Sequence, residues 1–331
     1  MQSLVLCRSD TCRRSAAPAQ LVVVCICTRD RPRGLARCLT SVLSQALLKD
    51  LKDHCQLKVV VVDNSSTASE RARIVALDSH KVPVIYVHEP KPGIPFARNA
   101  ALEAALKLRP KWIAFIDDDE VAPHGWILTL IETAEVAKAD VVQGALISVS
   151  AANIEDLAAA WRPRGAVAKV RRASTAATNN VLFRTWIVDR PTALRFDENM
   201  QECGGSDGEF FMRATIAGAQ IMRTSDAPVF EERSKEREAP SWLRQRAFRV
   251  GANCNYRYRK NRKPKLVALA LLLGRAAERA VRGVLQALLS LLVLPFSLQR
   301  ASTFAHRSTL DFCFAWGCVA PYFGVEPRGY A

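Results

Sequence analysis

Short apolar runs alternate with amphipathic stretches over the first 120 residues of the chain. Residues 21–27 are continuously apolar, the pattern of a strand buried on both faces of a parallel sheet. Similar runs follow at residues 57–62, 84–87 and 113–116. Amphipathic segments of helical length separate these runs, at residues 34–45, 70–79 and 96–108. The alternation predicts βαβ units and therefore an α/β fold with a mainly parallel sheet.

The chain is less regular between residues 140 and 240. Short strands are predicted near residues 140–149, 178–183, 219–222 and 229–230. The pair Gly204-Gly205 predicts a tight turn before a helix with Asp207 and Glu209 in its first turn. Residues 151–177 are weakly patterned and rich in basic residues, so we expect a mobile segment over the functional site. An α/β domain is therefore predicted over residues 21–240, after a basic N-terminal arm at residues 1–20.

The remaining 91 residues have a different composition. Residues 241–265 contain nine Lys and Arg and no acid, and residues 266–273 and 284–296 are strongly apolar. Neither apolar piece reaches the ~18 residues that a spanning helix needs. Arg275, Arg279 and Arg282 fall on one helical face, which favours an amphipathic helix lying in a membrane interface. A helical hairpin dipping into the membrane and plain packing against the α/β domain are the alternatives.

Charge and cysteine content narrow the class of protein. The net charge is +15, and most of it lies after residue 240, which indicates an anionic ligand or membrane surface as the partner of this region. Nucleic acid is a weaker candidate, because no nucleic-acid-binding motif is present. Ten scattered cysteines without a CxxC pair favour free thiols over disulfides or a zinc site. The chain has neither GxGxxG after its first strand nor a P-loop, which disfavours dinucleotide oxidoreductases and P-loop nucleotidases.

Carboxylates follow two of the predicted strands. Asp63 ends the second strand, and Asp117, Asp118, Asp119 and Glu120 follow the fourth. Four adjacent carboxylates repel one another unless a cation binds them, and oxygen ligands suit Mg²⁺ or Mn²⁺. An acidic loop that caps the next helix is the alternative explanation. In open α/β sheets ligands bind outside the carboxyl ends of the strands, where these residues fall.

Five motifs, taken in order, resemble those of family 2 glycosyltransferases. They are Cys27-Thr28-Arg29, Asp63-Asn64, Pro95-Phe-Ala-Arg-Asn99, Phe115-Ile-Asp-Asp-Asp-Glu120 with Trp126, and Gly204-Gly-Ser-Asp-Gly-Glu-Phe211. The resemblance covers residues 21–250 and implies the GT-A fold, which binds nucleoside diphosphate sugars. Within the family, the pattern is most similar to bacterial exopolysaccharide transferases of the succinoglycan type.

The resemblance also implies roles for individual residues. Asp207 would be the general base of an inverting transfer, and Asp119 would bind Mg²⁺ or Mn²⁺. The residues implied in binding the nucleotide sugar are Thr28, Arg29, Asp63 at the uracil, Arg98, Asp117 at the ribose, and Asp118. Further candidates for contacts with the acceptor or the diphosphate are Glu209, Glu231, Arg246 and Arg249.

Two positions depart from the family pattern. Ser206 replaces the glutamate that commonly precedes the catalytic aspartate, and Val229-Phe230-Glu231 stands where many members have a histidine. We expect an inverting transferase that moves a hexose from a nucleoside diphosphate sugar, with a UDP-sugar as the favoured donor. The expected acceptor is a lipid-linked glycan at the cytoplasmic face of the inner membrane, during surface polysaccharide assembly. Two alternatives remain open, namely transfer to polyprenyl phosphate and a catalytically silent scaffold that binds glycans or nucleotide sugars.

Overall fold

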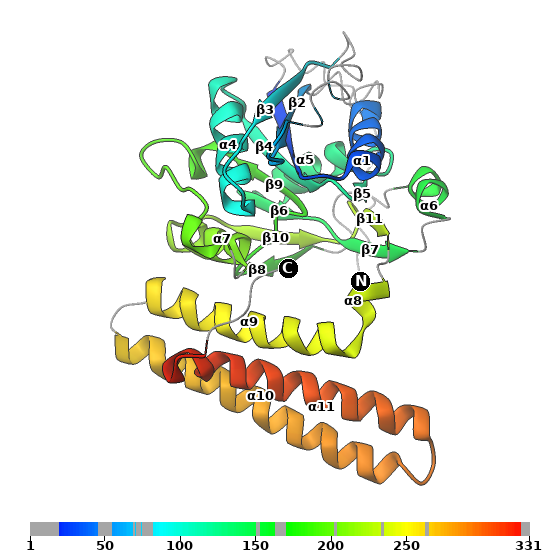
Figure 1. The fold of residues 1–331 in the computed structure, drawn as a ribbon. Helices are drawn as coiled ribbons and strands as arrows, with labels where there is room; N and C mark the ends of the chain where they lie inside the picture. Colours follow the sequence, from blue (N-terminus) through cyan, green and yellow to red (C-terminus); the bar gives the residue numbers. More distant parts are fainter. Residues whose placement is uncertain are drawn as a thin grey trace, which may run out of the picture.

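The four predicted N-terminal strands form one half of a large sheet (Figure 1). The computed structural model describes residues 20–45, 55–68, 70, 74, 82–149, 153–162, 170–201, 204–232, 235–261 and 265–325. The four strands are β1 (Gln20–Thr28), β2 (Cys55–Asp63), β3 (Val84–His88) and β4 (Trp112–Asp117), which are parallel in the order β3-β2-β1-β4. The predicted basic arm and most of the predicted helix at 70–79 lie outside the described residues.

The register of these strands brings their polar ends together. Thr28 is opposite Asp63, and Cys27 is opposite Asp117. Because parallel strands place their carboxyl ends at one edge, the side chains that follow β1, β2 and β4 meet there.

The other half of the sheet is mixed. Antiparallel β9 (Asn180–Arg184) lies beside β4, followed by β6 (Val141–Gln143), β10 (Ile221–Thr224) and the edge strand β8 (Val170–Ala173). A second sheet contains β5 (Glu120–Val121), β11 (Val229–Glu232) and β7 (Leu146–Val149). The predicted α/β fold with a mixed, mainly parallel sheet is confirmed.

Helices cover both faces of the large sheet. Helices α1 (Pro32–Gln45) and α5 (Trp126–Val136) enclose one apolar core, and α4 (Ile94–Lys107) and α7 (Ser206–Ile216) enclose the other. Short 3-10 helices, η2 (Thr185–Ile187) and η3 (Glu198–Met200), connect β9 to α7. The second core includes Phe183, Phe210 and Phe211, which are fully buried and in ring contact with one another. This packing fixes the start of α7 relative to the sheet.

The segment at residues 151–177 differs from the prediction, because its described parts are helix and strand. Helix α6 (Ile154–Ala160) buries Ile154 and Ala158 against Phe230 of β11. These two residues are four positions apart and so lie on one helical face. Strand β8 pairs with β10 at the sheet edge. A two-residue apolar face and a four-residue edge strand are too short to give a clear periodic signal.

Three long helices form a layer beside the sheet (Figure 1). Helix α9 (Pro240–Asn261), which follows the short α8 (Lys235–Glu238), lies between the α/β body and a hairpin of α10 (Lys265–Val293) and α11 (Leu298–Val319). The 3-10 helix η4 (Ala320–Phe323) follows α11. Asn255 ties α9 to the end of α11 by donating a 2.7 Å hydrogen bond to the carbonyl of Cys318.

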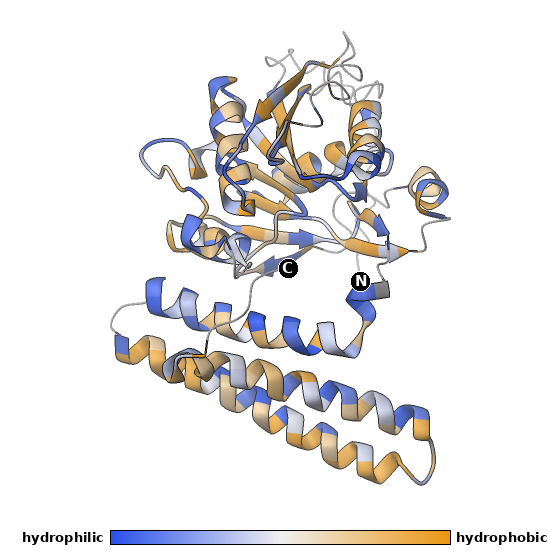
Figure 2. Ribbon diagram, viewed as in Figure 1, coloured by the Kyte–Doolittle hydropathy of each residue, from blue (hydrophilic) through white to orange (hydrophobic). Residues whose placement is uncertain are grey.

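The orientation of α10 shows which way its arginine face points. Arg279 and Arg282 point into the hairpin, where they pair with the buried Asp311 of α11 at 2.7 and 3.0 Å. Arg275 lies over the ring of Tyr258 of α9. The opposite side of α10 exposes large apolar residues instead, among them Val281, Leu285, Leu288 and Leu292 (Figure 2). Within the described residues, no helix combines the length and the apolar character needed to cross a bilayer.

Candidate active site

The acidic cluster lies at the end of β4, where the turn from Asp117 to Glu120 leads into β5. The Asp117 amide donates to Oε2 of Glu120 at 3.0 Å, and the Asn179 side chain donates to Oε1 at 3.0 Å. Burial is the main cause that raises the pKa of Glu120 well above its usual value, and the neighbouring charge of Asp117 raises it further. The two hydrogen bonds oppose this shift. Glu120 therefore supports the turn from inside, below the three aspartates.

Asp117 has a strongly shifted carboxyl group. Burial raises its pKa to about 7, and the guanidinium of Arg98 opposes this shift. The neighbouring aspartates and Asp207 raise the pKa further. Asp117 and Asp207 therefore lie close enough to interact electrostatically, although 90 residues separate them in the sequence.

Arg31 is a residue of this cluster that the sequence analysis did not single out. Its Nη1 atom lies 3.2 Å from Oδ1 of Asp118 and 2.9 Å from Oδ2 of Asp119. The Thr28 hydroxyl donates to the other oxygen of Asp118 at 2.7 Å. Burial raises the pKa of Asp118, while Thr28 and Arg31 lower it in part. Thr28 and Asp118 are almost completely buried and fasten the loop after β1 to the turn after β4. Their predicted contacts with a nucleotide stay predictions.

Asp119, the predicted metal ligand, is partly exposed. Arg237 lies 3.8 Å from its Oδ2 and 3.6 Å from Oε2 of Glu231, so this guanidinium bridges the two carboxylates. Among the described residues, no three His, Cys, Asp or Glu side chains are arranged to bind a metal ion. Mg²⁺ in nucleotide enzymes commonly uses one or two carboxylates together with phosphate oxygens and waters. Asp119, with Glu231 across the same guanidinium, fits that smaller ligand set.

Asp63 and Asn64 organise the next loop of the site. Asp63 is fully buried, and its carboxylate accepts hydrogen bonds from the Ser65 and Glu70 amides and from the Tyr86 hydroxyl. Burial raises the pKa of Asp63, but these donors outweigh it and lower the pKa overall. Asn64 fixes the segment before α4 through the Glu89, Lys91 and Gly93 backbone groups. In this arrangement Asp63 shapes the predicted nucleoside pocket, and its contact with uracil stays a prediction. Arg29 is exposed beside Asp30.

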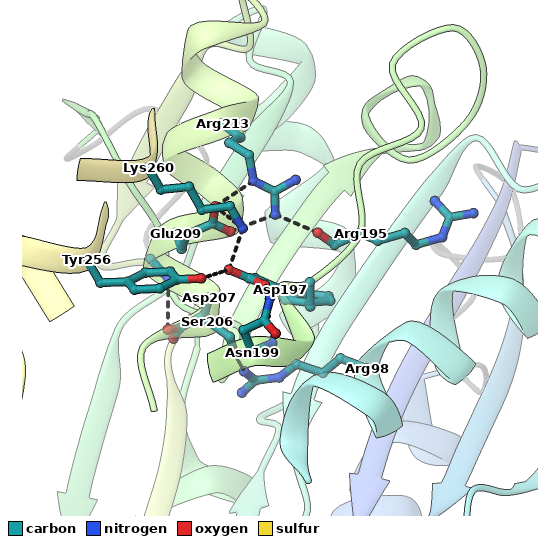
Figure 3. Close-up of polar contacts among 12 residues, drawn as sticks. Arg98, Arg195, Asp197, Asn199, Ser206, Asp207, Glu209, Arg213, Tyr256 and Lys260 are labelled. Carbon is teal, nitrogen blue, oxygen red and sulfur yellow. Dashed lines mark hydrogen bonds and ion pairs between the residues drawn. The ribbon is translucent and has the colours of Figure 1, made fainter. Parts of the chain in front are cut away.

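The turn before α7 delivers Asp207 to the same site (Figure 3). Gly204 and Gly205 have φ values of 69° and 79°, a left-handed backbone that favours glycine. Asp207 follows in the first turn of α7, half-buried, and accepts a hydrogen bond from the Gly208 amide. Ser206, the departure from the family pattern, accepts a 3.1 Å hydrogen bond from Arg98. Arg98 thus links Ser206 and Asp117 in one site.

Glu209 does not face the site, which corrects its predicted substrate contact. It is fully buried, and Arg213 donates to both of its oxygens at 2.8 and 2.6 Å. Lys260 of α9 also approaches Glu209 and forms an ion pair with Asp197 (Figure 3). The Tyr256 hydroxyl donates to the same Asp197 oxygen. Glu209 therefore anchors α7 and α9 to the loop before η3.

The two arginines predicted on α9 have different surroundings. Arg246 is exposed and lines a pocket beside the first turn of α7. Arg249 is only 7% exposed and does not line that pocket. Its predicted contact with an acceptor or diphosphate stays a prediction.

The polar partners that sequence reasoning missed come from distant segments. They are Arg31, Asn179, Asp197, Arg213, Arg237, Tyr256 and Lys260. Among them, only Arg31 could have been found from the sequence. It lies in a basic run directly after the first predicted strand, and the fourth predicted strand is followed by acidic residues. Asp197 and Lys260 are 63 positions apart, and no spacing pattern joins them.

Comparisons with known proteins decide the family. The glycosyl transferase family 2 model matches residues 23–188. The succinoglycan biosynthesis protein ExoM of Rhizobium meliloti (strain 1021) is 31% identical over 238 residues, which are 68% of this chain and 71% of ExoM. The chain belongs to glycosyl transferase family 2. The predicted membership and the resemblance to succinoglycan-type proteins are confirmed.

Solved structures confirm the GT-A fold of this glycosyltransferase. Residues 1–349 of S. aureus TarS in complex with UDP-GlcNAc superpose with a TM-score of 0.51 at 15% identity, covering 93% of each chain. The mannosyltransferase PcManGT from Pyrobaculum calidifontis, in complex with GDP-Man and Mn²⁺, gives a TM-score of 0.59 at 17% identity, covering 91% of this chain and 87% of that one.

Proposed function

We propose that this glycosyltransferase inverts the anomeric centre of a hexose that it transfers from a nucleoside diphosphate sugar, preferentially a UDP-sugar. One observation supports this above all: Asp117 at the end of β4 lies close enough to both Arg98 and Asp207 to interact with them electrostatically, and Arg98 also donates to Ser206 beside Asp207. The donor would bind at the ends of β1, β2 and β4. Thr28, Arg29, Asp63 and Asp117 are the residues proposed to line its nucleoside pocket, and Arg98 faces the diphosphate.

Asp207 is the group that fits the role of general base. An inverting displacement needs one base on the acceptor side of the sugar. The carboxylate of Asp207 takes the proton of the acceptor hydroxyl while the oxygen of that hydroxyl bonds to the anomeric carbon. The bond from that carbon to the diphosphate oxygen breaks, and the nucleoside diphosphate leaves with the electron pair. Arg98 supplies positive charge on the leaving-group side of the site.

Mg²⁺ or Mn²⁺ is the proposed cofactor. When bound, the ion neutralises charge on the departing diphosphate. Asp119 is the residue placed to bind it, with Glu231 as a second carboxylate beyond Arg237. PcManGT was solved with GDP-Man and Mn²⁺, which supports the choice of a divalent ion.

The proposed acceptor is a lipid-linked glycan in exopolysaccharide synthesis, as the name of the relative ExoM suggests. A pocket of about 700 Å³ between η3, α9 and α10 supports a lipid-linked molecule. Its lining combines the cationic Arg259, Lys260 and Lys265 with the apolar Leu266 and Leu269. The apolar part of this pocket suits the hydrocarbon chain of a lipid-linked molecule.

The exposed apolar side of α10 supports attachment to the cytoplasmic face of the inner membrane. Because the arginines of α10 are directed to Asp311, the helix turns leucines outward. An exposed apolar stripe of this kind on a basic region favours an anionic bilayer surface. Sedimentation with anionic vesicles tests this attachment. Leu288→Glu with Leu292→Glu should abolish it, whereas Thr303→Glu with Thr309→Glu on α11 should leave it.

An assay of nucleoside diphosphate release tests the transferase activity. The donors are a panel of UDP-sugars, which release UDP, and GDP-mannose, which releases GDP; membrane extract supplies the acceptor. We expect release that EDTA suppresses and that Asp207→Asn lowers at least a thousandfold. Asp189→Asn makes the same change at an exposed loop residue and should leave the rate unchanged. Full activity of Asp207→Asn would contradict the assigned base.

A further inference from the structure

Four arginines line a pocket of about 750 Å³ between α9 and the edge of the large sheet. Arg171 and Arg223 come from β8 and β10, and Arg246 and Arg257 come from α9. None of the described residues that line the pocket is acidic. The volume is typical of sites for small ligands.

The two arginines from the sheet repel each other. Arg171 and Arg223 are register partners in the antiparallel pair of β8 and β10. Like charges directly opposite each other in a sheet are destabilising. Arg223 donates to the Thr175 carbonyl at 3.1 Å, and within the described part of the chain neither arginine has a carboxylate within ion-pair distance. A bound anion would relieve this repulsion.

Arg257 joins the pocket to the proposed base. Its Nη1 atom lies over Gly208, where a Cβ would be only 2.4 Å away, so a larger residue there would displace the end of this side chain. Gly208 follows Asp207 directly in the first turn of α7. The first turn of α7 is thus covered by a guanidinium on the pocket side.

Asp207 therefore lies between two regions of opposite charge. On one side are the aspartates after β4, where the donor is proposed to bind, and on the other are the four arginines. A base in an inverting transfer contacts the acceptor, which attacks from the side of the sugar opposite the leaving group. The arginine pocket is accordingly on the acceptor side of the site.

We propose that this pocket binds a phosphate or diphosphate group of the acceptor, near the hydroxyl that receives the sugar. This inference rests on the proposed function and specifies its acceptor. Guanidinium groups bind phosphate through paired hydrogen bonds, and four of them complement the several negative charges of a diphosphate. The pocket selects anionic acceptors and orients their hydroxyl toward Asp207.

Isothermal titration with inorganic diphosphate tests the site, in EDTA and at a fixed salt concentration of about 0.1 M, because phosphate contacts are screened by salt. The double variant Arg171→Gln with Arg223→Gln should bind diphosphate at least tenfold more weakly than the wild type. Arg172→Gln is the matched control, because this residue is next on β8, faces the other side of the sheet and does not line the pocket. Its affinity should stay within twofold.

Thermal unfolding gives a second measurement of the same site. Diphosphate should raise the melting temperature of the wild type and of Arg172→Gln, but not that of the double variant. Without ligand, the double variant should be at least as stable as the wild type, since it loses a repulsive pair. Equal binding by all three proteins, or no binding by the wild type, would overturn the proposal.

Competition experiments identify which anion the arginines bind. Protein saturated with UDP should still bind diphosphate, and the double variant should bind UDP normally. Competition by UDP would assign the arginines to the donor and overturn the proposal. Tighter binding of glucuronate or sulfate than of diphosphate would also overturn it. UDP release decides the proposed function and diphosphate binding decides this inference, so either can fail alone.

Discussion

Arg98 on α4 donates a 3.1 Å hydrogen bond to the hydroxyl of Ser206 on α7, and this contact connects the donor side of the site to the residue before the proposed base. The serine replaces a carboxylate that is common in the family. A neutral hydroxyl at this position orients Arg98 without neutralising it. The full guanidinium charge then remains available to Asp117 and to a donor diphosphate.

Ser206→Ala should therefore lower kcat about fivefold, because losing one hydrogen bond of roughly 1 kcal/mol leaves Arg98 less well oriented. The KM for the donor should change less than twofold, since the positive charge remains. Steady-state kinetics on the donor identified by UDP release measures both values. Ser44→Ala, on the exposed face of α1, is the control. An unchanged kcat in Ser206→Ala would show that the contact does not affect the reaction.

The sequence predicted the half of the site that depends on strand ends. Apolar runs locate β1, β2 and β4, and the residues after them meet because parallel strands end at one edge. Sequence reasoning could not predict the partners supplied by α8 and α9, such as Arg237 and Lys260. Those contacts depend on how the helical layer packs, which no local period specifies.

The same limit applies to the orientation of α10. Periodicity correctly grouped Arg275, Arg279 and Arg282 on one face, but it did not show which face is covered. Asp311, 29 residues beyond Arg282, decides this by pairing with the arginines inside the hairpin. Asp311 is the only acid of α11, and this was the available signal.

If Asp119 binds the metal ion as proposed, Arg237 should compete with the ion for this carboxylate. Because its guanidinium bridges Asp119 and Glu231, removing it should free both carboxylates. Arg237→Gln should thus bind Mn²⁺ several-fold more tightly than the wild type in the presence of UDP. Electron paramagnetic resonance of free Mn²⁺ measures this affinity without turnover. Arg237→Gln combined with Asp119→Asn should lose the gain, and retention of the gain would exclude Asp119 as the ligand.

Asp197 makes a contribution to stability that depends on pH. Burial raises its pKa, but Lys260 and Tyr256 outweigh burial and lower it below the usual value. A carboxylate with a lowered folded-state pKa stabilises the fold above its unfolded pKa of ~3.9 and loses this effect as pH falls through the folded value.

Asp197→Asn should consequently lower the melting temperature by several degrees at pH 7, and the difference from wild type should shrink below pH 4. Thermal unfolding of both proteins from pH 3 to pH 8 measures this. Asp189→Asn should track the wild type throughout. A constant difference between Asp197→Asn and wild type at every pH would contradict the ionic origin of the effect.

Among the acidic residues of the helical layer, Asp311 is the one whose substitution should lower the free energy of unfolding most. It is 3% exposed and accepts from Arg279, Arg282 and Gln286 at 2.7, 3.0 and 3.3 Å. Asp311→Asn would leave two guanidinium groups without their counter-ion. Breaking a buried pair costs 3–5 kcal/mol, and about 2 kcal/mol is expected here because both arginines are partly exposed. Urea denaturation followed by circular dichroism measures the loss.

Glu278→Gln removes an exposed acid from the same hairpin and should change stability by less than about 0.5 kcal/mol. Equal effects of the two substitutions on the free energy of unfolding would show that the pairing of Asp311 with its arginines does not stabilise the hairpin.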